Sequence, residues 1–114
     1  MNLPPHQRVA IVTGASSAIG AVIAKRLAKD NIAVVVHYLK NAQSAENIVS
    51  EINSLGGMAT AIEADVSRSV EVATMFNRTL NIFGAIDIVI NNAGMMPENK
   101  PLADVDDVIF NLII

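Results

Sequence analysis

The stretch VAIVTGASSAIG, residues 9–20, begins as a continuous apolar run, passes through a turn rich in glycine and serine, and continues with apolar residues at helical spacing. Val9–Thr13 is therefore predicted to be a strand buried on both faces, and a helix is predicted from about Ala18 to Asp30. A strand, a tight turn and a helix in this order are typical of the first unit of a parallel α/β sheet.

The same alternation continues along the rest of the chain. Further strands are predicted at 32–38, 58–64 and 85–90, and further helices at 41–55, 67–82 and 99–114. Asn31, the Gly56-Gly57 pair and Gly84 mark helix ends, and Ser67 is predicted to cap the start of the third helix. Alternating strands and helices imply parallel strands joined by right-handed crossovers. The expected fold class is α/β, a doubly wound parallel sheet with helices on both faces.

Composition and charge exclude several classes of function. The chain has 114 residues, enough for one domain, and 52% of them are hydrophobic, as strands buried on both faces require. A net charge of -3 without any Lys/Arg cluster argues against a nucleic-acid surface, and no apolar run approaches the roughly 20 residues of a membrane span. The absence of cysteine excludes a disulfide framework and a thiolate metal site. MNLPPHQR at the start is unlike a signal peptide, so a cytoplasmic location is the default expectation.

The turn at residues 13–20 has the composition of a phosphate-binding loop. Gly14 permits a sharp exit from the strand, and Ser16 and Ser17 offer hydroxyl and backbone N–H groups to phosphate oxygens. Gly20 would let the following helix, whose N-terminus favours anions, pack closely on the sheet. Ala18 stands where such loops often have a middle glycine, and any strand-to-helix turn favours Gly and Ser. The loop alone therefore does not distinguish a nucleotide site from an ordinary turn.

Together with two later segments, this loop resembles the N-terminal part of the short-chain dehydrogenase/reductase family, over essentially the whole chain. The family's loop pattern T-G-x-x-x-[A/G]-x-G is matched by Thr13, Gly14, Ala18 and Gly20, and Ala at the middle position is a tolerated variant. The resemblance implies a Rossmann-type sheet with strand order 3-2-1-4. It also implies that residues 1–114 form one dinucleotide-binding domain, cut before the catalytic half.

The later segments are ADV at 64–66 and NNAG at 91–94. The resemblance implies that Asp65 faces the adenine amino group, that Asn91 and Asn92 tie the central strands together, and that the cofactor passes close to the backbone beyond them. Alternatively, Asp65 only begins the turn into the third helix. The cofactor-binding residues predicted in this way are Gly14, Ser16, Ser17, Ile19, Gly20, Tyr38, Asp65, Val66, Asn92, Ala93 and Gly94.

The end of the second strand indicates which dinucleotide is bound. An acidic residue there accepts from the ribose 2′-OH of NAD, whereas its loss suits the 2′-phosphate of NADP. Tyr38 takes that place, no carboxylate lies between Asp30 and Glu46, and Lys40 is the nearest cation. VVVHYLKN also resembles the VVVNY pattern of NADP-linked members such as 3-oxoacyl carrier-protein reductases. NADP is therefore expected in preference to NAD, and His37 is expected to be a packed strand residue and not a ligand.

The resemblance implies hydride transfer between nicotinamide and a carbonyl or alcohol carbon, with a serine and a Tyr-x-x-x-Lys pair as catalytic residues. The only tyrosine, Tyr38, is followed three and four positions later by Asn41 and Ala42, so the chain contains no such pair. Asn111 matches the register of the family's F-D pair and is not assigned to catalysis. No catalytic and no metal-binding residue is predicted.

Two alternatives remain for the chain as it stands. VIFNLII at 108–114 is an apolar run without a stop signal, and 85–90 would form an exposed apolar edge strand, both of which favour a truncated chain. The chain is then either the NADP(H)-binding portion of an oxidoreductase or an inactive fragment that only binds nucleotide or self-associates. A full-length relative is expected to form a homo-oligomer.

Overall fold

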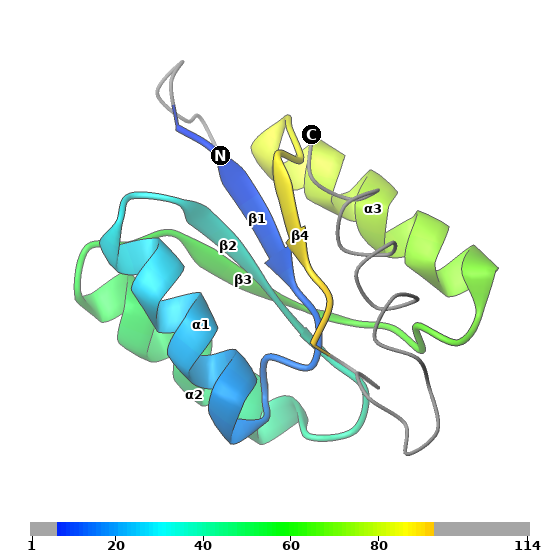
Figure 1. Ribbon diagram of the computed structural model, residues 1–114, viewed down its shortest axis with the longest axis horizontal. Helices are drawn as coiled ribbons and strands as arrows, with labels where there is room; N and C mark the ends of the chain where they lie inside the picture. The colour runs from blue at the N-terminus through cyan, green and yellow to red at the C-terminus, as the bar shows by residue number, and fades with distance from the viewer. Residues whose placement is uncertain (1–6, 93–114) are drawn as a thin grey trace, which may run out of the picture.

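The computed structural model describes residues 7–92, in which strands and helices alternate as predicted (Figure 1). The predicted helix at 99–114 lies outside the described residues. The elements are β1 (Val9–Val12), α1 (Ala18–Lys29), β2 (Ala33–Tyr38), α2 (Ala42–Ser54), β3 (Ala59–Glu63), α3 (Ser69–Phe83) and β4 (Ile88–Ile90).

The strands form one parallel sheet in the order β3-β2-β1-β4, which confirms the predicted order. At the last residue of β1, Val12 is in register with Val36 of β2 and with Ile90 of β4. Parallel strands end at the same edge of a sheet, and ligands of such sheets bind there. The segments that meet at this carboxyl edge are 13–17, 39–41, 64–68 and 91–92.

Helices cover both faces of the sheet, with α1 and α2 on one face and α3 on the other (Figure 1). Successive strand residues point to opposite faces. Val35 therefore belongs to the apolar cluster that contains Met75 of α3, whereas Val34 and Val36 belong to the cluster that contains Ile48 of α2. Because both faces are covered, the strands read as continuous apolar runs in the sequence.

The helices end where the sequence predicted. Asn31 follows α1 with φ 68°, Gly56 follows α2 with φ 91°, and Gly84 follows α3 with φ 85°. These are left-handed conformations, which glycine and asparagine adopt most readily and which turn the chain out of a helix.

The predicted start of the third helix is wrong. Ser67 does not cap α3, because the helix begins at Ser69 with Arg68 in the cap position and without a side-chain cap hydrogen bond. The Ser67 hydroxyl donates instead to Asp65 Oδ1 at 2.6 Å. A carboxylate two residues earlier in the chain competes for the hydroxyl, and a local turn forms where a cap was expected.

The predicted strand 85–90 is too long, since β4 spans only Ile88–Ile90. Asp87 closes the pairing at its amino end: its N–H donates to Val9 O at 2.9 Å, and its Oδ2 accepts from the Val9 N–H at 2.8 Å. The other predicted bounds agree with the structure to within one or two residues, which is the usual spread at element ends.

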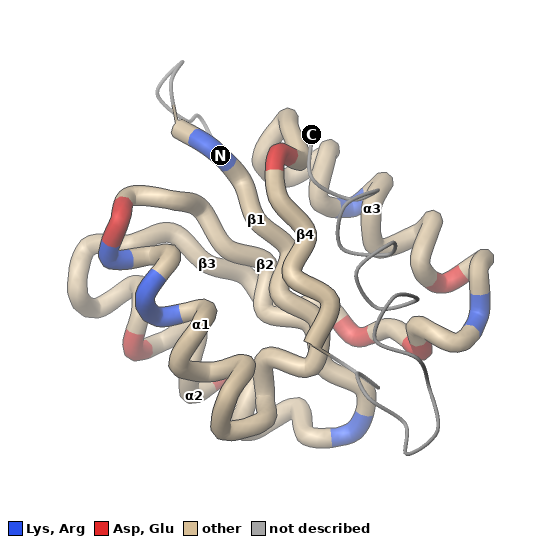
Figure 2. Tube along the Cα trace, viewed as in Figure 1, with Lys and Arg blue, Asp and Glu red and all other residues tan. Residues whose placement is uncertain are grey.

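Charged residues lie mostly on the helices and the connecting segments (Figure 2), and Glu63 is the only charged residue in the four described strands. Residues 13–20, which join β1 to α1, carry no charge. Among the described helices, none combines the length and the apolar character that crossing a membrane requires.

Candidate functional site

The connection from β1 to α1 is a compact turn closed on Gly14, which has φ 61°. The Gly14 carbonyl oxygen accepts from the Ser17 N–H at 3.0 Å and from the Ser17 hydroxyl at 2.8 Å. The Ser17 hydroxyl oxygen accepts from the Gly20 N–H at 3.1 Å, which makes Ser17 the N-cap of α1. Both polar groups of Ser17, predicted from the sequence as phosphate donors, are thus engaged in stabilising the turn.

Gly20 determines how closely α1 approaches this turn. A Cβ at Gly20 would lie 2.6 Å from the Ala15 Cα and would collide with the Gly14 carbonyl oxygen. Ala15 and Gly20 are both buried, so no space is available for a side chain. The close approach that the sequence predicted is therefore between the first turn of α1 and the backbone that leaves β1.

The end of β4 is bonded to the end of β1. Thr13 Oγ1 lies 3.2 Å from both Ile90 O and Asn91 Oδ1, and it accepts from the Asn92 N–H at 2.8 Å. The Thr13 N–H also donates to Ile90 O at 3.0 Å, which extends the pairing of the two strands past their last residues. The two asparagines therefore join the central strands, as the sequence predicted for this segment.

The Asn92 side chain reaches the turn itself. Asn92 Nδ2 donates to Gly14 O at 3.2 Å and to Ser17 Oγ at 3.1 Å. These bonds connect residues 78 and 75 positions apart, so the turn depends on the far end of the described chain. Ala93 and Gly94, predicted to lie along the cofactor, are outside the described residues.

His37 of β2 connects three segments at this edge. Its side chain is 1% exposed; Nδ1 accepts from the Gly14 N–H at 2.9 Å, and Nε2 lies 2.7 Å from Ala64 O. The Ala15 N–H donates to the His37 carbonyl oxygen at 3.0 Å. Because an amide N–H only donates and a carbonyl oxygen only accepts, the ring is neutral with its proton on Nε2.

The surroundings of His37 favour this neutral ring. Burial lowers the pKa of the imidazole, and the hydrogen bond to the Ala64 carbonyl raises it in part, so that the pKa lies below its ordinary value of about 6.5. The sequence prediction of a packed strand residue is confirmed. Its contact with the turn was missed, although a lone histidine inside an apolar run was a signal that a polar partner had to be found.

Three backbone N–H groups of the turn have no hydrogen-bond partner among residues 7–92, namely those of Ser16, Ala18 and Ile19. The Ser16 hydroxyl donates to no group in the same part of the chain. Unpaired N–H groups at a helix start carry a partial positive charge, and α1 has no acidic residue in its first turn to offset it. This arrangement favours a bound anion.

The end of β2 lies beside that turn. Tyr38 is half-buried against the cluster that α1 and α2 share, and Lys40 is exposed. Asn41 is the N-cap of α2, with its Oδ1 accepting from the Ser44 N–H at 3.1 Å. The Ser44 hydroxyl donates to Ser16 O at 3.2 Å and so joins α2 to the turn.

The sheet also places a carboxylate next to Tyr38 that a search along β2 could not find. Glu63, the last residue of β3, is in register with Tyr38, and residues in register point to the same face of a sheet. Glu63 is exposed. Glu63 lies 25 residues after Tyr38 in the sequence, so inspection of the second strand alone does not find it.

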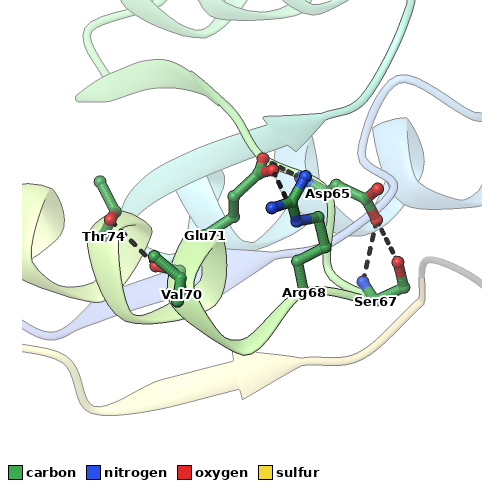
Figure 3. Close-up of polar contacts among 6 residues, drawn as sticks. All are labelled: Asp65, Ser67, Arg68, Val70, Glu71 and Thr74. Carbon is green, nitrogen blue, oxygen red and sulfur yellow. Dashed lines mark hydrogen bonds and ion pairs between the residues drawn. The ribbon is translucent and has the colours of Figure 1, made fainter.

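Asp65 forms a local turn after β3 (Figure 3). Its Oδ1 accepts from the Ser67 hydroxyl at 2.6 Å and from the Ser67 N–H at 3.0 Å, and these two bonds, the hydroxyl first, lower the pKa of the Asp65 carboxyl. The Asp65 N–H donates to Glu71 Oε1 at 2.8 Å, and Glu71 Oε2 lies 3.6 Å from Arg68 Nε. Val66 packs against the α3 cluster. Oδ1 therefore forms the turn, and Oδ2 has no hydrogen-bond partner within residues 7–92.

A hollow lies at the opposite end of the sheet from the predicted site. It has a volume of 470 Å³ and is lined in part by Asn31, Gly56 and Gly57, which precede β2 and β3. It shares no lining residue with the predicted site. Within the part of the chain that the structure describes, no group of three or more His, Asp or Glu side chains could hold a metal ion.

The parallel order β3-β2-β1-β4, with helices on both faces and a glycine turn after β1, defines a Rossmann-type α/β protein. The sequence model of the short chain dehydrogenase family matches residues 8–114, and the chain belongs to this family, the short-chain dehydrogenases/reductases.

Individual relatives agree with this assignment. The chain is 46% identical over 88 residues to an uncharacterised oxidoreductase of Methylorubrum extorquens, which covers 77% of this chain and 36% of the relative. It is 41% identical to a hydroxynaphthalene reductase-like protein of Metarhizium guizhouense, over 92% of this chain and 40% of the relative. A short chain dehydrogenase of Burkholderia cenocepacia, crystallised in complex with NADP, superposes with a TM-score of 0.74 and 41% identity, covering 93% of this chain and 44% of that one. The chain thus spans about two-fifths of the length of these relatives.

Proposed function

We propose that this chain is the NADP(H)-binding portion of an oxidoreductase that transfers a hydride between nicotinamide and a carbonyl or alcohol carbon. The observation that carries the proposal is the set of unpaired N–H groups of Ser16, Ala18 and Ile19 at the carboxyl edge of a parallel sheet. Family membership and a relative crystallised with NADP support it.

The residues present fit a dinucleotide. The unpaired N–H groups suit a pyrophosphate, and Gly14 and Gly20 keep the backbone of the turn free of side chains. Asp65 Oδ2 and the Val66 backbone would receive the adenine, and Tyr38 would lie beside the adenosine ribose. Asn92, Ala93 and Gly94 would line the nicotinamide side. When bound, the nicotinamide supplies or accepts the hydride; the residues of this chain bind and orient the dinucleotide.

Preference for NADP over NAD follows from the end of β2. Tyr38 offers no carboxylate to a ribose 2′-OH, and Lys40 is an exposed cation two residues further on. Glu63, the register partner of Tyr38, is the group that would oppose a 2′-phosphate. The exposed Glu63 side chain is proposed to turn to solvent, where water and salt screen its charge from the 2′-phosphate.

A binding role without catalysis is the second candidate. It is favoured by one observation: the chain contains a single tyrosine, Tyr38, and no Tyr-x-x-x-Lys pair. An assay in which the chain is mixed with NADPH and a panel of simple ketones tests the second candidate. Oxidation of NADPH would contradict it, whereas saturable binding without oxidation is the result that a binding role alone predicts.

A titration with NADPH and with NADH, followed by nicotinamide fluorescence, tests the cofactor assignment. Wild-type chain is expected to bind NADPH more tightly than NADH, and Tyr38→Asp is expected to lower the NADPH/NADH affinity ratio by at least about tenfold, because a carboxylate repels the 2′-phosphate. Tyr38→Asn, which removes the ring without adding charge, is the matched control and should change the ratio much less.

Glu63→Gln tests whether the Glu63 charge affects the NADPH/NADH affinity ratio. If Glu63 turns to solvent, this variant leaves the NADPH/NADH ratio within about twofold of wild type. A rise of tenfold or more on Glu63→Gln, or an unchanged ratio in Tyr38→Asp, would contradict the specificity argument. Failure of the wild type to bind either dinucleotide would contradict the proposed function itself.

A further inference from the structure

One buried side chain positions two of the loops that meet at the carboxyl edge. The His37 ring bridges the Gly14 N–H, 2.9 Å from Nδ1, and the Ala64 carbonyl oxygen, 2.7 Å from Nε2. Gly14 opens the turn whose later N–H groups are unpaired, and Ala64 immediately precedes Asp65. The placement of the turn after β1 relative to the turn after β3 therefore depends on the imidazole.

We propose that His37 is a positioning residue for the dinucleotide: its neutral ring, protonated on Nε2, holds the turn after β1 in the conformation that binds phosphate, and protonation of the ring releases that turn and weakens binding. The proposal rests on the proposed function, because dinucleotide affinity is one of its readouts. His37 acts through Gly14 and Ala64 and contacts no ligand itself.

The hydrogen-bond chemistry allows only one protonation state. Adding a proton places an N–H on Nδ1, which then faces the Gly14 N–H, and two donors cannot bond to one another. The Nε2–H bond to Ala64 O is unaffected. The ring stays attached to the β3 turn and loses the β1 turn, so that a buried amide is left without a partner.

No charged side chain competes for the ring among the described residues. β1 and residues 13–20 carry no charge, while on β3 and the turn after it Glu63 is exposed and Asp65 is bonded within its own turn. On α3, Glu71 accepts from the Asp65 N–H, and Lys40 beyond β2 is exposed. Burial and the Ala64 carbonyl are the causes of the shifted pKa of His37, and neither is a charge.

The direction of the pH effect follows from that shift. Because burial lowers the pKa of His37 in the folded chain, the unfolded chain takes up a proton first as the pH falls. The stabilisation is complete above about pH 6.5, the ordinary value for an unfolded histidine, and is lost as the pH falls through the lower pKa of the folded chain. Dinucleotide binding is expected to weaken toward the acid end of the same range.

Nitrogen NMR of the wild-type chain without ligand tests the ring directly. At about pH 8, two-bond ¹H–¹⁵N spectra are expected to show a neutral His37 ring with its proton on Nε2, and the Gly14 amide is expected to shift as that ring titrates. The chain has two histidines, His6 and His37, and a His6→Asn variant assigns the signals. A ring protonated on Nδ1 would overturn the proposal.

Affinity for NADPH, measured from about pH 8 to pH 5.5, tests the consequence. The wild type and His6→Asn are expected to lose severalfold more affinity than His37→Asn does, because an asparagine Oδ1 accepts from Gly14 without titrating. The difference is expected to be less than about tenfold, because the pKa of His37 lies below 6.5. The 2′-phosphate of NADPH also titrates, with a pKa near about 6. Because the same ligand is used for all three proteins, this titration contributes equally to each pH profile. His37→Phe, which removes both bonds, should bind weakly at every pH.

The outcomes separate the two proposals. Tight binding by the wild type at about pH 8, with the same pH profile in wild type and His37→Asn, would overturn the role of His37 and leave the proposed function intact. No binding by the wild type at about pH 8 would overturn the proposed function and this inference together. If the substitutions unfold the chain, the nitrogen spectra of the wild type still decide the state of the ring.

Discussion

The two ends of the sheet are built in different ways. At the amino end, the connections from the helices into β2, β3 and β4 are turned by local backbone geometry: Asn31, Gly56 and Gly84 have positive φ, and each follows the helix that it ends. One side chain also bonds across strands there, since Asp87 Oδ2 accepts from the Val9 N–H. At the carboxyl end, the turn after β1 is held by side chains from β2 and from the end of β4. His37 bonds Gly14, and Asn92 bonds the same residue from the end of β4.

This difference supports the proposed dinucleotide site at the carboxyl edge. A connection that is turned by its own backbone can be predicted from a few residues and tolerates substitutions in the rest of the molecule. A connection that needs three strands to hold it is costly to assemble, and it leaves the N–H groups of Ser16, Ala18 and Ile19 unpaired. Such a preorganised edge is what a ligand requires. Matched substitutions at the two ends test whether they differ in this way.

The largest effect is expected at the glycines with positive φ. Gly14→Val and Gly84→Val both place a β-branched residue at a left-handed backbone, with φ 61° and 85°, so both lose stability. Only Gly14→Val is expected to reduce NADPH affinity, by about 100-fold or more, because Gly14 anchors the turn. Calorimetry of both variants checks this. Equal affinity in the two variants would show that the turn after β1 does not bind the dinucleotide.

A smaller effect is expected where glycines allow close packing. A Cβ at Gly20 would lie 2.6 Å from backbone, at Ala15 Cα, whereas a Cβ at Gly57 would lie 2.7 Å from the Ile52 Cγ2 atom and 3.1 Å from the Ile52 carbonyl oxygen. Gly20→Ala should destabilise the fold by about 1–3 kcal/mol, and Gly57→Ala by less, because the shortest contact at Gly57 is with a side chain and its backbone contact is longer. Urea denaturation measures both. The reverse order would contradict the packing described for α1.

The smallest effect is expected for two asparagines with matched roles. Asn92 donates to Gly14 O and Ser17 Oγ at the carboxyl end, and the Asn53 side chain bonds both the N–H and the carbonyl of Ala59 near the amino end. Each change to alanine should cost about 1 kcal/mol of stability.

The same pair of variants separates stability from binding. Asn92→Ala alone is expected to weaken NADPH binding, by a factor of about three to ten. Thermal melts with and without NADPH report both quantities. A similar loss of NADPH affinity in Asn53→Ala would show that the two ends of the sheet are not functionally distinct.

Local sequence patterns predicted most of the fold. Apolar runs and helical spacing predicted all seven described elements, and alternation of strands with helices predicted a parallel sheet. The errors arise from polar side chains whose hydrogen bonds the pattern of apolar residues does not show. Ser67 was predicted as a cap, but Asp65 takes its hydroxyl, and Asp87 closes the start of β4 where an apolar strand was predicted.

The sequence predicted which residue types form the candidate site, but not which residues they contact. The sequence was enough to predict a glycine turn after the first strand, a second strand without an acidic end, and the family to which the chain belongs, because these depend on residues close together in the chain. The structure was needed to show that Glu63 lies in register with Tyr38 and that His37 holds Gly14. Strand pairing brings these residues together across 23 positions or more of the chain, and no local pattern encodes a contact over such a distance.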